Sequence, residues 1–156
     1  MNTPDKSADS FSQESRSVVI GSDHGGFDLK EHIKIHLQNE GYMIDDKGCF
    51  SSESCDYPDF GYQVAQSVGE RHHDKGILIC KSGIGMSIVA NKVKNVRAAL
   101  CYNQEAARLS RAHNDANILV MGSHFVSPAD AVAIIRTFFE TPFEGGRHCR
   151  RVEKIA

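Results

Sequence analysis

The chain lacks a long apolar segment, a strong net charge and a paired-cysteine motif, and each absence excludes a class of protein. No apolar run approaches the roughly 20 residues that span a membrane, and the N-terminus has no hydrophobic signal-peptide core. Lys and Arg number 18 against 20 Asp and Glu, so the net charge of −2 gives no overall field that would attract nucleic acid or an anionic membrane. We therefore expect a cytoplasmic protein in which any selectivity for phosphate is local.

The five cysteines form no CxxC pair and no metal-like cluster with the eight histidines. Without an export signal, reduced thiols are the default. His72 and His73 are followed by Asp74, a pattern more typical of a solvated surface corner than of a zinc site. The sequence therefore predicts reduced thiols and no structural metal.

The 156 residues, 40% apolar and 24% charged, have the size and composition of one ordinary globular domain. Residues 1–16 contain four serines, several charges and only one large apolar residue, Phe11. Such a segment cannot bury enough surface to offset the entropy lost on ordering. We predict a flexible N-terminal extension over residues 1–16 and a folded domain over residues 17–156.

Short apolar runs alternate with helical patterns five times after residue 16. The runs at 17–21, 42–47, 77–80, 96–101 and 117–121 predict strands. A helical pattern follows each of them, and the last helix is expected at 128–140. Met43 and Ile44 in the second strand, and Met86, Ile88 and Val89 in the helix after the third, are expected to face the core. The alternation predicts right-handed crossovers and an α/β fold, a three-layer α/β/α Rossmann-like domain with a five-stranded parallel sheet.

The stretch 76–92, GILICKSGIGMSIVANK, indicates a chemical function more directly than any other. A buried strand would end at Cys80, and a helix would follow a turn made of Lys81, Ser82, Gly83, Ile84 and Gly85. We call these five residues the anion turn, because a strand that restarts as a helix leaves N–H groups unpaired where the helix dipole favours negative charge. A thiolate is favoured at its edge. The competing interpretation is that Cys80 is a small buried hydrophobe, and the turn lacks a full Walker or dinucleotide spacing.

Polar side chains also follow other predicted elements. Asp23 and His24 come after the first strand, where open α/β sheets bind ligands, although Asp23 could simply cap the next helix. Tyr57 ends a loop before a helix, so its phenol could face a polar ligand or cover the helix start. His113 and Asn114 belong to a polar cluster expected to lead into the fifth strand.

The C-terminal segment 141–156 is basic behind a pair of glycines. Arg147, His148, Arg150 and Arg151 lie within five positions. A solvated basic terminus is the common explanation for such a run. Arginine also binds phosphate through a bidentate fork, and Arg147 and Arg151 would share one face if the segment were helical.

Five motifs together resemble the type B ribose-5-phosphate isomerases, in the wider family of pentose- and hexose-phosphate isomerases that includes galactose-6-phosphate isomerase. The motifs are GSDHGG at 21–26, DYP at 56–58, LICKSGIGMSIVANK at 78–92, LSRAHNDAN at 109–117 and EGGRHCRRVEKI at 144–155. The resemblance covers residues 17 to about 155, which leaves only the polar extension outside.

The resemblance implies an aldose–ketose isomerase that needs no metal and no redox cofactor. It implies that Cys80 is the base that moves a proton between C1 and C2, and that His113 is the acid that helps to open the sugar ring. The residues implied to bind substrate are Asp23, His24, Tyr57, Asn114 and His124 around the sugar, the anion turn at the enediolate, and Arg147 and Arg151 at the phosphate. It also implies a homodimer, in some members a dimer of dimers, whose sites borrow residues from the partner subunit.

One position departs from the family pattern, which usually has glycine after the base where this chain has Lys81. If that position needs a positive φ, lysine is strained there. If not, its ammonium could favour the Cys80 thiolate or touch a substrate oxygen. Ser82 replaces a frequent threonine and keeps the hydroxyl.

Three functions remain open at this point. Isomerisation of ribose 5-phosphate and ribulose 5-phosphate is favoured. The alternatives are the same chemistry on a hexose 6-phosphate, such as galactose or allose 6-phosphate, and a non-catalytic phosphosugar-binding module.

Overall fold

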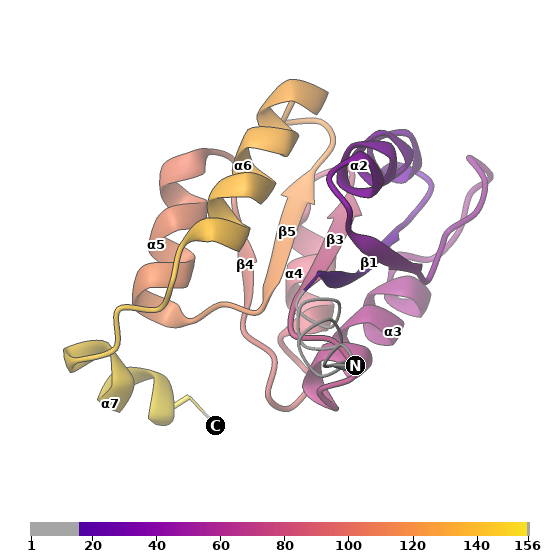
Figure 1. Ribbon diagram of the computed structural model, residues 1–156. Coiled ribbons are helices and arrows are strands. Elements are labelled where there is room, and N and C mark those ends of the chain that lie inside the picture. The colour runs from indigo at the N-terminus through magenta and orange to yellow at the C-terminus, as the bar shows by residue number, and fades with distance from the viewer. Residues whose placement is uncertain (1–15, 156) are drawn as a thin grey trace, which may run out of the picture.

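The computed structural model describes residues 16–155, in which strands and helices alternate along the chain (Figure 1). The strands are β1 (Ser17–Ser22), β2 (Met43–Asp46), β3 (Gly76–Cys80), β4 (Ala98–Leu100) and β5 (Ile118–Gly122). The helices are α2 (Phe27–Asn39), α3 (Tyr57–Gly69), α4 (Ile84–Ala90), α5 (Gln104–Asn114), α6 (Pro128–Glu140) and α7 (Arg147–Glu153). The predicted flexible extension, residues 1–16, lies outside the described residues except for Arg16, whose carbonyl accepts a hydrogen bond from the Met43 N–H.

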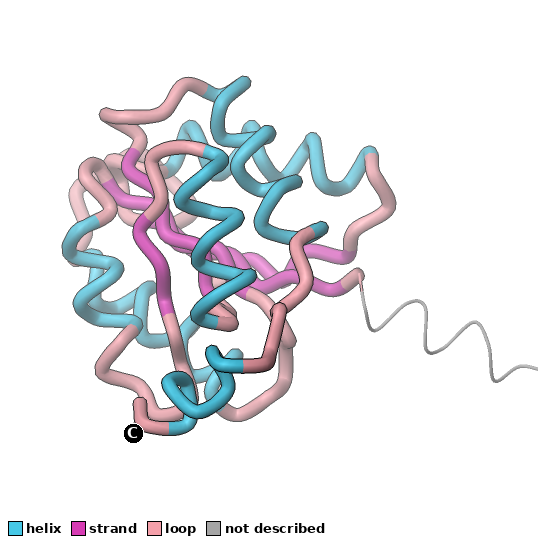
Figure 2. Tube along the Cα trace, turned by 90° about the vertical axis from the view of Figure 1, so that its left-hand side faces the viewer, coloured by secondary structure: helices cyan, strands magenta, loops and turns pink. Residues whose placement is uncertain are grey.

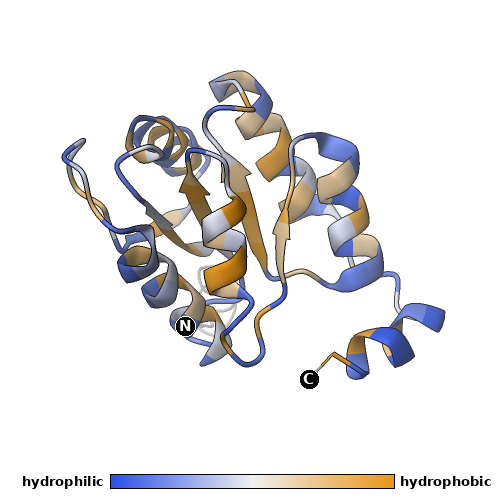
Figure 3. Cartoon of the chain, turned by 180° about the vertical axis from the view of Figure 1, so that it is seen from behind, coloured by the Kyte–Doolittle hydropathy of each residue, from blue (hydrophilic) through white to orange (hydrophobic). Residues whose placement is uncertain are grey.

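The five strands form one parallel sheet in the order β2-β1-β3-β5-β4, which confirms the predicted α/β fold. Side chains alternate across it: Ile77 and Ile79 pack in a core with α2, α5 and α6, whereas Leu78 and Cys80 pack in a second core with α3 and α4. Apolar strands between two more polar helical layers are visible in Figure 3. Because both faces are covered, the central strands read as continuous apolar runs. No helix within residues 16–155 is long and apolar enough to cross a membrane.

The strand order fixes where a ligand can bind. From β1 the chain moves outward to β2, and it then returns to place β3 on the other side of β1. Open α/β sheets bind ligands at such a reversal, outside the carboxyl ends of the strands. The turn after β1 packs closely against the end of β3 at this point, since a Cβ at Gly26 would lie 2.6 Å from the Ile79 carbonyl oxygen.

Two residues predicted to be buried are exposed. Met43 is 62% exposed, because neighbouring residues of a strand point to opposite faces and it is Ile44 that packs on the core. Ile88 is 58% exposed, because the short helix α4 buries only one face. That face is formed by Met86, Val89 and Ala90.

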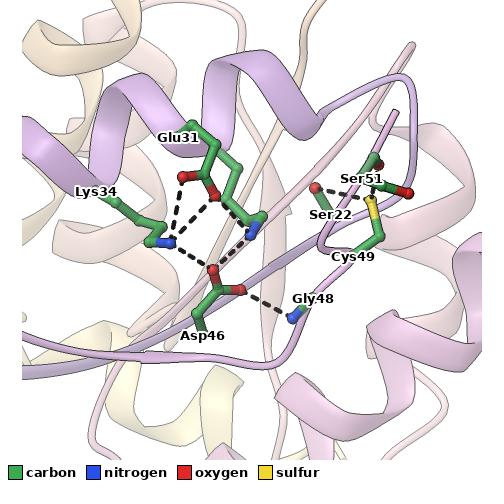
Figure 4. Close-up of polar contacts among 8 residues, drawn as sticks. Ser22, Glu31, Lys34, Asp46, Gly48, Cys49 and Ser51 are labelled. Carbon is green, nitrogen blue, oxygen red and sulfur yellow. Dashed lines mark hydrogen bonds and ion pairs between the residues drawn. The ribbon is translucent and has the colours of Figure 1, made fainter. Parts of the chain in front are cut away.

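A buried lysine ties α2 to the loop that leaves β2. Lys30 is fully buried, and its Nζ lies 2.6 Å from Asp46 Oδ2, which Lys34 also contacts at 2.7 Å (Figure 4). Asp46 accepts a hydrogen bond from the Gly48 N–H at 2.8 Å. The Gly48 carbonyl in turn accepts from the Ser22 N–H at 2.7 Å, at the end of β1. This ion pair therefore fixes the start of the loop that runs beside the ligand-binding edge of the sheet.

Burial opposes ionisation of Asp46, but the hydrogen bonds from Lys30, Lys34 and the Gly48 amide outweigh it, and the pKa of the carboxyl lies below its ordinary value. A carboxyl with a lowered folded-state pKa stabilises the fold above its unfolded-state pKa. That stabilisation is lost as the pH falls through the lower, folded-state pKa. The ion pair should therefore contribute at neutral pH and disappear in acid.

We predict that Asp46→Asn lowers the free energy of unfolding at pH 7 by about 3 kcal/mol, because it leaves a buried ammonium without its carboxylate. The difference from wild type should shrink below about pH 4, as the pH falls from the unfolded-state pKa of the carboxyl toward its lower folded-state pKa. Urea unfolding at both pH values measures this. Glu31→Gln, which removes a more exposed partner of the same lysines, should cost less than about 1 kcal/mol. Equal losses for the two variants would contradict the assigned role of Asp46.

Candidate active site

The carboxyl ends of β1, β3 and β5 bring three predicted segments together, at what we call the carboxyl edge of the sheet. Asp23 and His24 follow β1, the anion turn follows β3 and His124 follows β5. Backbone hydrogen bonds join the segments: the Asp23 N–H donates to the Ile79 carbonyl at 3.3 Å, and the His124 N–H donates to the Lys81 carbonyl at 2.9 Å.

Cys80 ends β3 with its side chain 5% exposed, in the core beneath α3 and α4. Its Sγ accepts a hydrogen bond from the Gly83 N–H at 3.1 Å. Gly83 has a φ of +83°, a conformation that L side chains rarely adopt, and a Cβ there would also lie 2.4 Å from a Leu100 methyl. An amide that donates to the sulfur favours the thiolate over the thiol. The turn thus supplies the Cys80 sulfur with a backbone hydrogen-bond donor.

The anion turn presents further amides. The Ile84 N–H donates to Ser82 Oγ at 3.1 Å, whereas the N–H groups of Ser82 and Gly85 have no hydrogen-bond partner within residues 16–155. Ile84 and Gly85 already belong to α4, so these amides stand at the positive end of a helix. The Tyr57 ring covers the turn, because a Cβ at Gly85 would lie 2.7 Å from it. Tyr57, the first residue of α3, therefore lies at the carboxyl edge.

Lys81 does not have a positive φ, since the described non-glycine residues that do are Arg71, Asn95 and Asp115. Lysine is therefore unstrained after Cys80, which removes the first of the two alternatives for this position. Its exposed side chain leaves the turn beside Gly25, where a Cβ would lie 3.2 Å from the Lys81 Cβ. The lysine therefore leaves the anion turn on the side that faces the turn after β1.

The turn after β1 holds its polar side chains in defined states. His24 Nδ1 accepts from the Cys55 N–H at 3.2 Å, which places the proton of the neutral ring on Nε2 as a free donor. Asp23 is nearly buried, and its Oδ1 accepts from the Gly26 N–H at 3.0 Å. Asp23 therefore bridges the turn before α2 with one oxygen, and its second oxygen remains for a ligand.

His113 and Asn114 are not in a loop before β5, as predicted, but are the last two residues of α5. The helix continues to Asn114 because Asp115 adopts the left-handed conformation that ends it. A crossover helix runs antiparallel to its strands, so the end of α5 lies at the amino edge of the sheet, opposite Cys80. Arg97, just before β4, donates to the Asn114 carbonyl at 3.1 Å and fixes that position.

A second cluster forms at this amino edge. The rings of His113 and His148 stack with centroids 4.3 Å apart and planes 13° from parallel. Glu144 Oε2 lies 3.8 Å from His113 Nε2 and 3.6 Å from His148 Nε2. Burial, His113 and Arg147 lower the pKa of His148 below its ordinary value, which favours a neutral ring.

The histidines form no cluster along the sequence, but His113 and His148 come together in the fold, which corrects the interpretation that they are scattered. With Glu144 they offer three potential metal-ligand atoms within 4.8 Å of one another. Nearly parallel rings, however, direct their nitrogen lone pairs side by side and not at one point, as a tetrahedral metal would need. The stacked rings therefore do not have the geometry of a tetrahedral metal site.

Arg147 and Arg151 lie one turn apart on α7, so the predicted shared helical face exists. Both are exposed and form no ion pair within residues 16–155. The segment before α7 is anchored to α5, because the Glu144 N–H donates to the Ala112 carbonyl at 3.0 Å. A groove of about 610 Å³ lies at this edge beside β4. Its lining includes Asn114 and Ile155.

The predicted residues therefore form two groups at opposite ends of the sheet. The first group is Cys80 with the anion turn, Asp23, His24, Tyr57 and His124, and the second is His113, Asn114, Arg147 and Arg151. Figure 1 shows the arrowheads of β3 and β5 pointing away from α7, so α7 lies at the amino edge of the sheet. Figure 2 shows the same arrangement from the side, with the C-terminal helix below the sheet. The length of β5 alone separates the two edges by roughly 15 Å. No single chain brings all the predicted residues into one pocket.

The structure also reveals a contact that no pattern in the sequence indicates. The Tyr102 hydroxyl, just after β4, donates to the Ser82 carbonyl of the anion turn at 3.0 Å. The phenol reaches across the end of β5, where Gly122 leaves room because a Cβ would lie 2.3 Å from the Ser82 oxygen. Only the strand order, in which β5 separates β3 from β4, brings these residues together.

Comparison with known proteins finds close relatives along almost the whole chain. The sequence model of a family described as Ribose/Galactose Isomerase matches residues 18–155. Ribose-5-phosphate isomerase B of Escherichia coli is 45% identical over 140 residues, which cover 90% of this chain and 94% of the relative.

Solved structures agree with the sequence match. Ribose-5-phosphate isomerase B of Clostridium thermocellum superimposes with a TM-score of 0.88 at 50% identity, covering 89% of this chain and 94% of that one. The enzyme of Mycoplasma genitalium, solved with bound ribulose 5-phosphate, gives 0.86 at 42% identity, covering 89% and 93%.

Proposed function

The chain belongs to the ribose/galactose isomerase family, and we propose that it interconverts D-ribose 5-phosphate and D-ribulose 5-phosphate through an enediolate, with Cys80 as the base. The ribulose 5-phosphate complex of a 42% identical relative supports the substrate. The observation that carries the mechanism is the Cys80 sulfur held by an amide of a turn that has further free amides. Isomerisation moves one proton between neighbouring carbons with no net oxidation, so it requires no redox cofactor.

The reaction begins with ring opening. His113 donates a proton to the ring oxygen, and a group of the Asp23–His24 pair accepts the proton of the C1 hydroxyl. The Cys80 thiolate then removes the proton from C2, and the electrons of that bond form the enediolate. The proton of the C2 hydroxyl moves to the C1 oxygen, and the neutral thiol returns the carbon-bound proton to C1, which leaves the ketose and restores the thiolate. A well-placed base of this kind typically contributes about 10²–10⁴ in rate.

The anion turn stabilises the intermediate. Negative charge develops on the substrate oxygen when the proton leaves, and preorganised amides are suited to hold it. The free N–H groups of Ser82 and Gly85 and the exposed ammonium of Lys81 supply such donors. Arg147 and Arg151 bind the remote phosphate, which orients the sugar without taking part in the proton transfer.

The two groups of residues form one site when two chains associate. The carboxyl edge supplies the base and the anion turn, and the amino edge of a second copy supplies the acid and the phosphate-binding arginines. A two-fold dimer contains two such sites, because each chain gives both halves. Exposed apolar side chains beside the carboxyl edge support coverage by a partner. They are Tyr57, Ile84, Ile88, Tyr102 and Phe125.

The cytoplasm is the compartment that the cysteines support. All five are free thiols in the structure, including the buried Cys49, Cys80 and Cys101. Reduced cysteines persist in the cytoplasm and tend to be oxidised outside it.

We predict that Cys80→Ser lowers the turnover of ribose 5-phosphate by at least about 100-fold while substrate binding is largely kept. A serine hydroxyl is a much weaker acid than a thiol, whereas the contacts to the phosphate do not involve this side chain. A cofactor-free assay of ribulose 5-phosphate formation and calorimetric binding measure the two effects. Galactose 6-phosphate and allose 6-phosphate, assayed in parallel with wild type, should be poor substrates. Unchanged turnover in Cys80→Ser would remove the base from the mechanism.

The shared site predicts complementation between two inactive variants. Cys80→Ser and His113→Ala alter different halves, so a mixed dimer carries one doubly altered site and one intact site. Purified by a different tag on each chain, the mixed dimer should recover about half of the wild-type turnover.

The matched control pairs Cys80→Ser with His24→Ala. Both changes lie at the carboxyl edge, so each site of that mixed dimer keeps one defect and no recovery is expected. Equal activities for the two mixed dimers would contradict a site shared between chains.

A further inference from the structure

The peptide unit between Ser82 and Gly83 is hydrogen-bonded at both of its polar ends. Its N–H, on Gly83, donates to the Cys80 sulfur at 3.1 Å. Its carbonyl, on Ser82, accepts from the Tyr102 hydroxyl at 3.0 Å. A single amide therefore joins the tyrosine to the sulfur.

The surroundings hold this amide in one orientation. Gly83 fixes one side with its φ of +83°. Gly122 fixes the other, since the Ser82 oxygen occupies the space that a Cβ at Gly122 would fill. Rotation of the peptide would therefore break both hydrogen bonds together.

The tyrosine is itself oriented by its neighbours. Its ring stacks on Phe125, with centroids 4.8 Å apart and planes at 28°. The edge of the His124 ring meets Phe125 at 5.1 Å and 88°. A phenol that is already held in place loses little conformational freedom when its hydroxyl binds the carbonyl.

We propose that Tyr102 is a positioning residue for the Cys80 base and acts through the Ser82–Gly83 peptide. A hydroxyl that donates to the carbonyl polarises the amide, which strengthens the N–H as a donor to the sulfur. A stronger donor favours the thiolate and keeps the sulfur beside the anion turn. This inference rests on the proposed role of Cys80 and adds a residue that need not touch the substrate.

Other ionisable residues belong to the segments that meet beside Cys80 at the carboxyl edge. They are Asp23 and His24 after β1, Tyr57 at the start of α3, Lys81 in the anion turn and His124 after β5. Replacement of Tyr102 by phenylalanine changes none of them and keeps the ring that stacks on Phe125. The variant therefore isolates the hydroxyl.

The test compares Tyr102→Phe with wild type in two assays. The first follows the alkylation of Cys80 by iodoacetamide across pH in ligand-free protein, read by mass spectrometry of the Cys80 peptide. Loss of the hydroxyl should slow alkylation at neutral pH by about 3- to 10-fold and move the midpoint of its pH dependence upward. The second is steady-state kinetics, in which kcat should fall by a similar factor while KM changes less than about twofold.

Tyr62→Phe is the matched control, because Tyr62 is exposed on α3 and its hydroxyl has no hydrogen bond in the described part of the chain. It should behave as wild type in both assays. Gly122→Ala reaches the same peptide from the opposite side and should also slow alkylation.

Identical alkylation profiles for Tyr102→Phe and Tyr62→Phe would overturn this inference and leave the isomerase mechanism intact. A fall in kcat without any change in alkylation would overturn it equally. Failure of the proposed function has a different signature, namely turnover that survives Cys80→Ser.

Discussion

The parallel sheet constrains everything else in this protein. Every strand ends at one edge, and every crossover helix returns the chain to the other edge. Residues that follow strands, such as Asp23 and the anion turn, must therefore gather at the carboxyl edge. Residues at the end of α5 and on α7 must lie at the amino edge. A mechanism that uses Cys80 and His113 together consequently needs two copies of the chain.

Within each chain, hydrogen bonds and an ion pair join the loops at the carboxyl edge to one another. The buried Lys30–Asp46 pair holds the loop after β2 against the end of β1. Further along that loop, the Cys55 amide fixes the His24 ring. On the other side, Ser123 Oγ donates to the Gly25 carbonyl at 2.7 Å and joins the turns after β1 and β5. Cys80 thus lies among turns that support one another, although each is irregular alone.

The sequence predicted the strands and helices of the fold, because they depend on local patterns. Short apolar runs, the glycines of the anion turn and the polar residues after strands are all readable from neighbours in the chain, and parallel strands then place those polar residues at one edge. His113 and Asn114 were misplaced because Asp115, not a glycine, takes the left-handed position that ends α5. Met43 was misassigned because an apolar residue in an edge strand need not be buried.

Contacts between segments that are far apart in the chain could not be predicted from local sequence patterns. Tyr102 lies 20 residues from Ser82, and nothing in either segment marks their hydrogen bond. It exists because β5 inserts between β3 and β4 and ends in a glycine. The stacking of His113 on His148 likewise depends on how α7 folds back against α5. The resemblance implied the roles of several residues, whereas the separation of the two edges is a property of the three-dimensional fold.

The most direct test is a crystal structure of the protein with a phosphorylated hydroxamate that mimics the enediolate. We expect the Cys80 sulfur within about 3.5 Å of the planar carbon that replaces the reacting centre, with the analogue oxygen on the anion turn. We also expect the phosphate to bind to Arg147 and Arg151 of a second copy. An analogue bound wholly within one chain, or bound far from the Cys80 sulfur, would contradict the shared site and the role of Cys80 as the base.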